Sequence, residues 1–120
     1  MSMKRPHDSP IAASLAATLA LAALIGFLTL TPIQNPGVPG TDKSHHLVAF
    51  AALALPLSFS RPRLALGVIL AAAAYGGAIE IIQPLVGRSR EVLDFVSDAA
   101  GAVIGGAAGV ALWRLRRRLA

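Results

Sequence analysis

The chain has 120 residues, of which 55% are hydrophobic and only 14% are charged. Ordinary soluble domains carry about 25% charged residues, so this composition excludes a soluble domain with a normal polar surface. The absence of cysteine excludes disulfides, thiolate metal ligands and cysteine nucleophiles. The net charge of +5 comes from basic residues at the ends of apolar segments, which favours a role in membrane topology over nucleic-acid binding.

The first apolar segment, residues 11–30, contains no charged residue and follows Lys4 and Arg5 in the N-terminal tail, residues 1–10. A helix needs about 20 apolar residues to cross ~30 Å of hydrocarbon, so the segment is long enough to span a membrane. The stretch that follows, LTLTPIQNPG, matches a signal-peptide cleavage site poorly. We therefore expect a retained membrane anchor, followed by a loop at the prolines and glycines of residues 32–40.

Three further membrane spans are predicted downstream. The apolar run 47–59 is short, but extending it back to Asp42 gives about 27 Å of helix, with Thr41 or Asp42 as the N-cap and a bend at Pro56. The basic turn SRPR separates this span from the next. The complete prediction is an all-α membrane protein, a four-transmembrane-helix bundle within residues 11–113, with spans at about 11–30, 42–59, 64–82 and 92–113 and a basic tail at 114–120.

Basic residues divide unequally between the two sides of such a bundle. The side with both termini and the 60–63 turn holds Lys4, Arg5, Arg61, Arg63, Arg114, Arg116, Arg117 and Arg118. The opposite side holds Lys43, Arg88 and Arg90. Because cytoplasmic loops carry the excess of Lys and Arg, both termini are predicted to lie in the cytoplasm.

Polar residues gather at the opposite, external end of the predicted helices. They form three pairs at helical spacing: Asp42 and His46, Glu80 and Gln83, Asp94 and Asp98. Small residues at four-residue spacing, including Gly101 and Gly105, continue the face of the last pair and allow close helix packing. A charge at the membrane centre costs about 2.5–3.5 kcal/mol on insertion scales, so we expect these side chains to face the bundle interior.

The candidate catalytic residues are His46, Glu80 and Asp98. If the two carboxylates lie close together, like-charge repulsion favours retention of one proton, which His46 would share in an acid/base pair. A metal site is not predicted, because the three residues come from three helices without a local metal-binding motif. No cofactor is predicted either.

The candidate substrate-binding residues surround this set: Asp42, Lys43, Gln83, Arg88 and Asp94. The guanidinium of Arg88 suits a carboxylate or phosphate, although an ion pair with Asp94 or Glu80 is an equal alternative. Asp94 alternatively serves as the N-cap of the last helix. Lys43 is a candidate for anion binding or a solvated flank of its helix.

Three motifs in this order resemble the VanZ-like family of small bacterial membrane proteins: DKSHHLVAF, EIIQPLVGR and DFVSDAAGAVIG. The family pattern is D-K-x-x-H-F, then E-x-x-Q with G-R, then D-x-x-x-N-x-x-G-x-x-x-G, on four spans. The matching positions, within about residues 41–109, are Asp42, Lys43, His46, Glu80, Gln83, Gly87, Arg88, Asp94, Asp98, Gly101 and Gly105. Leu47 replaces a common phenylalanine, and Asp98 replaces a common asparagine and so adds a carboxylate.

The resemblance implies a multi-pass protein of the bacterial cytoplasmic membrane with an envelope-linked role, connected in some members to glycopeptide resistance. It names no reaction. Three functions fit: binding of a lipid-linked or anionic envelope component in an external polar cavity, acid/base catalysis on a lipid headgroup, and proton-coupled transport. Transport is the weakest, because the cytoplasmic halves of the spans show no polar path. Membrane lipids are the expected partners, nucleic acid is not, and the oligomeric state is left open.

Overall fold

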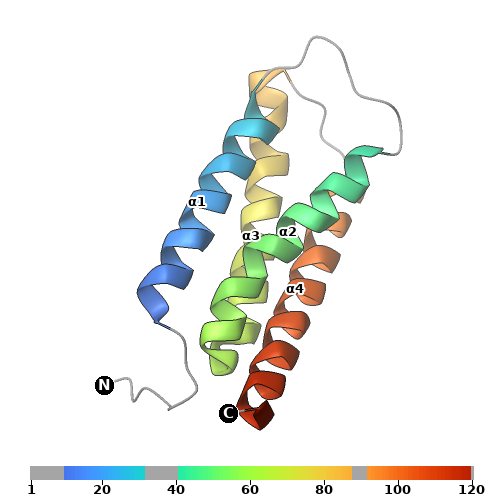
Figure 1. The fold of residues 1–120 in the computed structure, drawn as a ribbon. Coiled ribbons are helices and arrows are strands. Elements are labelled where there is room, and N and C mark those ends of the chain that lie inside the picture. The colour runs from blue at the N-terminus through green and yellow to red at the C-terminus, as the bar shows by residue number, and fades with distance from the viewer. Residues whose placement is uncertain (1–9, 32–40, 88–91, 120) are drawn as a thin grey trace.

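The computed structural model describes residues 10–31, 41–87 and 92–119. In this part of the chain every regular element is helical (Figure 1). The four long helices are α1 (Ile11–Leu30), α2 (Thr41–Ser60), α3 (Ala65–Ile82) and α4 (Val92–Leu119). Two short 3-10 turns, η1 (Pro62–Leu64) and η2 (Gln83–Val86), flank α3. The prediction of an all-α protein with four helices is confirmed.

Three segments are long and apolar enough to cross a membrane: α1, Pro62–Val86 around α3, and α4, with mean hydropathies of 2.3, 1.9 and 1.6. The apolar part of α2, Ser44–Ser60, is shorter, because Thr41, Asp42 and Lys43 open that helix. Large apolar side chains remain exposed on the outer faces, which suits contact with acyl chains rather than water. By length and composition, this is a membrane protein.

Helix α2 is the centre of the packing, since it contacts α1, α3 and, most extensively, α4. Gly101, Gly105 and Gly109 of α4 face the α2 backbone, and a Cβ added to any of them would lie too close to it. At the first two positions the nearest atoms are the carbonyl oxygens of Leu47 and Ala51. The glycines therefore let two helix backbones approach as closely as small-residue interfaces in membranes do.

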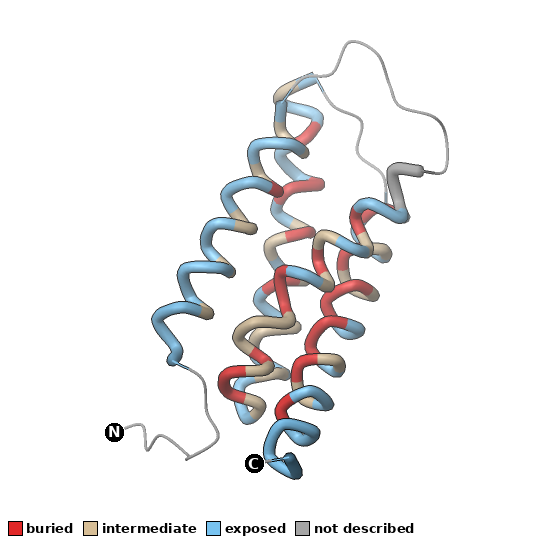
Figure 2. Tube along the Cα trace, viewed as in Figure 1, coloured by how far each residue is buried: buried red, intermediate tan, exposed pale blue. Residues whose placement is uncertain are grey.

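The buried residues lie where α2, α3 and α4 meet, as Figure 2 shows in red. The apolar core consists of Ile25, Phe50, Leu53, Ala54, Ala72, Ile79 and Ala102. The starts of α1 and α3 and the ends of α2 and α4 lie at one end of the molecule (Figure 1). We call this the basic end, because Arg61, Arg63 and the arginines of the last turns of α4 lie there, and we call the other the acidic end.

Helix α1 packs on the core with buried Ile25 and the partly buried Leu21, Ala22 and Leu30, and hydrogen bonds along its length add to this contact. The hydroxyls of Ser14 and Ser60 hydrogen-bond near the basic end. The Tyr75 hydroxyl donates to the Ala22 carbonyl at 2.5 Å near the middle. At the acidic end, the Gln83 side-chain nitrogen donates to the Thr29 carbonyl at 3.1 Å.

Helix α4 continues through the segment expected to be a basic tail, because it ends only at Leu119. Arginine and leucine are good helix formers, and cations near a helix C-terminus interact favourably with the helix dipole. Two of these arginines also lie against aromatic rings: Arg116 is 5.7 Å from the centroid of Phe59, and Arg117 is 5.1 Å from that of Trp113. The segment expected to be a tail is therefore part of α4, and its arginines contact rings at the end of α2 and on α4 itself.

Candidate functional site

His46 of α2 and Asp98 of α4 form the centre of the site at the acidic end. The Nδ1 atom of His46 lies 2.6 Å from Oδ1 of Asp98, a short hydrogen bond between side chains that are 5% and 0% exposed. The other imidazole nitrogen, Nε2, lies 3.8 Å from Oδ2 of Asp94, which is also buried. One imidazole is thus placed between two carboxylates, with a ring nitrogen facing each.

Helix geometry explains why both carboxylates face α2. Asp94 and Asp98 are four residues apart on α4 and therefore lie on one face, as the sequence predicts. Gly101 lies on the next turn and brings the backbone of α2 at Leu47, the residue after His46, against α4. Asp94 is also in the first turn of α4, where the helix dipole stabilises a negative charge.

Helix α3 closes the site from its other side. A Cβ at Gly76 would lie 2.8 Å from Oδ2 and 2.9 Å from Cβ of Asp98, so only glycine leaves room for this carboxylate. Glu80 lies one turn further along the same face of α3 and is buried. Because α3 and α4 run in opposite directions (Figure 1), Glu80 lies level with Asp94, one turn closer to the acidic end.

Gln83 is buried, but the structure gives it a partner away from His46. Its side-chain nitrogen donates to the Thr29 carbonyl of α1, so it fastens α1 to the end of α3. The sequence predicts a substrate-binding role for Gln83 and contains no signal for this contact, since Thr29 belongs to an apolar helix with no motif.

For three of the predicted substrate-binding residues, the structure does not describe the side chain. The backbone of Asp42 and Lys43 belongs to the first turn of α2, but their side chains lie outside the described part of the chain. Arg88 lies outside the described residues altogether. It follows Gly87, whose φ of 79° is left-handed and ends η2 in a conformation that glycine adopts readily.

The described side chains of the site carry three carboxylates, from Glu80, Asp94 and Asp98, and one imidazole, from His46. An imidazole held between carboxylates is suited to hold a proton and to pass it on. No group of three or more potential ligands is arranged to hold a metal ion within the described ranges. The imidazole and the carboxylates of the site can transfer protons and form hydrogen bonds.

The halves of the helices at the basic end contain buried polar residues that the sequence does not predict. Ser58, Ser60 and Arg61 are buried there, and the Arg61 guanidinium donates to the Ser60 carbonyl at 2.7 Å. The motif SFSR looks in the sequence like the start of an exposed basic turn, but Ser58 lies beside Gly109 of α4 and Ser60 hydrogen-bonds Ser14 of α1. Phe50 and Leu53 still separate this polar region from His46, so the core between the two ends is apolar.

Comparison with known proteins adds no assignment. No protein-family model, no curated protein and no solved structure matches this chain. The functional interpretation therefore depends on the residues of the site and on the resemblance of its three motifs.

Proposed function

We propose that this chain is a VanZ-like, four-span protein of the bacterial cytoplasmic membrane that binds a lipid-linked anion of the cell envelope at its acidic end. Helix α2 crosses the membrane in addition to the three longer apolar segments. Both termini lie in the cytoplasm, and the acidic end faces outward. The observation that carries the proposal is the buried pair of His46 and Asp98, with Asp94 beside it. Ionisable residues buried among membrane helices are costly and mark functional sites by default.

Two hydrogen bonds hold the described residues next to the cations of this end. His46 holds the start of α2 on α4, and Lys43 precedes it by three residues, which is nearly one helical turn. Arg88 follows η2, which Gln83 fastens to α1. Lys43 and Arg88 supply the charge that a phosphate or carboxylate requires, because the buried carboxylates cannot attract an anion.

A second function, acid/base catalysis on a lipid headgroup, is favoured by one observation. The Asp98 carboxylate accepts or shares the proton on Nδ1 of His46 and so orients the ring, as in His–Asp pairs that act as general bases. Glu80 would complete this set as the second proton-transferring carboxylate. Proton-coupled transport has less support, because the apolar core interrupts the polar residues.

Lipid extracts of cells with and without the protein separate binding from catalysis. A headgroup that changes chemically with expression of the protein indicates turnover, and Glu80→Gln should then abolish the change. An unchanged lipid that copurifies with the protein indicates binding. A contribution to glycopeptide resistance follows from the motif resemblance alone and is tested by the drug sensitivity of the same two strains.

The binding proposal predicts that Lys43→Ala and Arg88→Ala each lower the amount of copurified lipid-linked anion at least tenfold, because each removes a cation that contacts it. Native mass spectrometry of the purified protein measures the occupancy. Arg114→Ala is the matched control, since it removes an exposed cation from the opposite end. Equal occupancy in all three variants would contradict the proposal.

The topology predicts which positions are accessible from outside the cell. Single cysteines at Gly37 and Ser89 should react with a membrane-impermeant thiol reagent on intact cells, whereas a cysteine at Arg118 should react only after permeabilisation. Arg118 suits this use because it is exposed, whereas Ser60 in the turn at the same end is fully buried and would be unreactive on either side. Labelling of Arg118→Cys on intact cells would reverse the orientation.

A further inference from the structure

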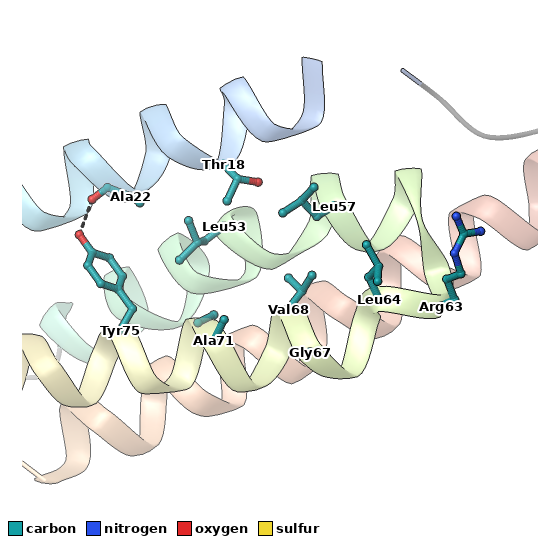
Figure 3. A pocket seen from close by; sticks show the side chains of 11 residues that line it. Thr18, Ala22, Leu53, Leu57, Arg63, Leu64, Gly67, Val68, Ala71 and Tyr75 are labelled. Carbon is teal, nitrogen blue, oxygen red and sulfur yellow. Dashed lines mark hydrogen bonds between the residues drawn. The ribbon is translucent and has the colours of Figure 1, made fainter. Parts of the chain in front are cut away.

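A groove of about 540 Å³ opens between α1, α2 and α3 towards the basic end. Figure 3 shows its walls, to which Ala22, Leu53, Leu57 and Val68 contribute apolar side chains. The hydrogen bond from Tyr75 to the Ala22 carbonyl crosses between α3 and α1 at its inner end. The groove is separate from the His46 site, which lies at the opposite end of the helices.

The dimensions of the groove match one lipid chain. Its lining runs from Leu64 of η1 to Tyr75 of α3, about 16 Å at 1.5 Å per residue, which is half of the ~30 Å hydrocarbon core and hence one leaflet. The volume lies within the roughly 300–1,000 Å³ of small-molecule sites. A helix of the same length and ~10 Å diameter would need more than ~1,000 Å³, so a second protein helix does not fit.

The polar groups of the groove are placed for a phospholipid. Arg63 lies at the outer end (Figure 3), in the turn where lipid headgroups are expected, and its guanidinium suits a phosphate. Thr18 lines the middle, and its hydroxyl oxygen is buried without a hydrogen-bond partner among the described residues. That hydroxyl is a donor for a lipid ester carbonyl.

We propose that this groove is a binding site for an anionic phospholipid, with one acyl chain between α1 and α3 and the phosphate on Arg63. The site is a second lipid site that does not depend on the ligand proposed for the acidic end. The bound chain fills the space between α1 and α3, where Thr18 and Ala22 of α1 line the groove.

Gly67 gives a direct test, because it lines the groove and a Cβ built there meets nothing within 4 Å. Gly67→Phe should fill the groove without a clash. The protein is purified in detergent, mixed with phosphatidylglycerol and phosphatidylcholine of identical chains, and examined by native mass spectrometry. We expect one retained phosphatidylglycerol, at least tenfold preferred, and at least tenfold less of it in Gly67→Phe. Arg63→Ala should bring the two lipids close to equal retention.

Leu70→Phe is the control, because Leu70 lies on the same helix, is exposed and does not line the groove. Gly67→Leu repeats the test with a smaller side chain if the phenylalanine variant does not purify. Equal retention of both lipids by the unaltered protein, unchanged retention in the Gly67 variants, or an unchanged preference in Arg63→Ala would each overturn the proposal. Lys43→Ala and Arg88→Ala should leave phosphatidylglycerol bound, so the two lipid proposals fail or succeed separately.

Discussion

Replacement of Asp98 by alanine should lower the free energy of unfolding by about 3 kcal/mol, whereas replacement by asparagine should cost less than about 1.5 kcal/mol. Alanine removes the carboxylate that hydrogen-bonds Nδ1 of His46 and leaves that nitrogen of a buried imidazole facing an empty space. Asparagine keeps an oxygen that accepts from Nδ1 and also removes one of the three buried carboxylates. It is the residue commonly found at this position of the resembled motif.

Unfolding of the purified protein in mixed detergent micelles measures both changes. Val96→Ala is the matched control, since Val96 is two residues away on α4 but exposed on its outer face. If Asp98→Ala were no more destabilising than this control, the His46–Asp98 hydrogen bond would not hold α2 on α4. The same pair of variants also bears on function, because a binding role that needs only the geometry should survive Asp98→Asn, whereas general-base catalysis should be lost.

The helices were predictable because their signals are local. Long apolar runs, the prolines and glycines between them and the basic turn after Ser60 each lie within one segment of sequence, so four helices follow without knowledge of the packing. The shared faces of the site were also predictable, since a spacing of four residues places Asp94 and Asp98 on one side of any helix. The glycine spacing of α4 predicted the close packing that α2 and α4 display.

The contacts between side chains of different helices could not be predicted from the sequence. His46 and Asp98 are 52 residues apart, and only the register of α2 against α4 decides that Asp98, rather than Glu80, receives the hydrogen bond. The contact of Gln83 with Thr29 depends on where α1 docks, which its uniformly apolar surface does not specify. The buried position of Arg61 likewise depends on the packing of its turn, while its sequence context resembles that of an exposed flanking charge.

Gly105→Leu should prevent assembly of the folded protein, which is the largest effect we expect from any single substitution. A Cβ at Gly105 already meets the carbonyl of Ala51 more closely than real Cβ atoms approach a neighbour, and its nearest contacts are all backbone atoms. Backbone cannot rotate away as a side chain does, so the cost should exceed the ~1–3 kcal/mol typical of overpacked cores. Separation of α2 from α4 would also carry His46 away from Asp98, so binding at the acidic end should be lost together with stability.

Ala107→Leu places the same side chain on the exposed face of α4 and should leave the melting temperature within a few degrees of the unaltered protein. Equal yield and melting temperature of the two variants, measured in the same detergent, would show that the helices are not as close at Gly105 as the structure places them.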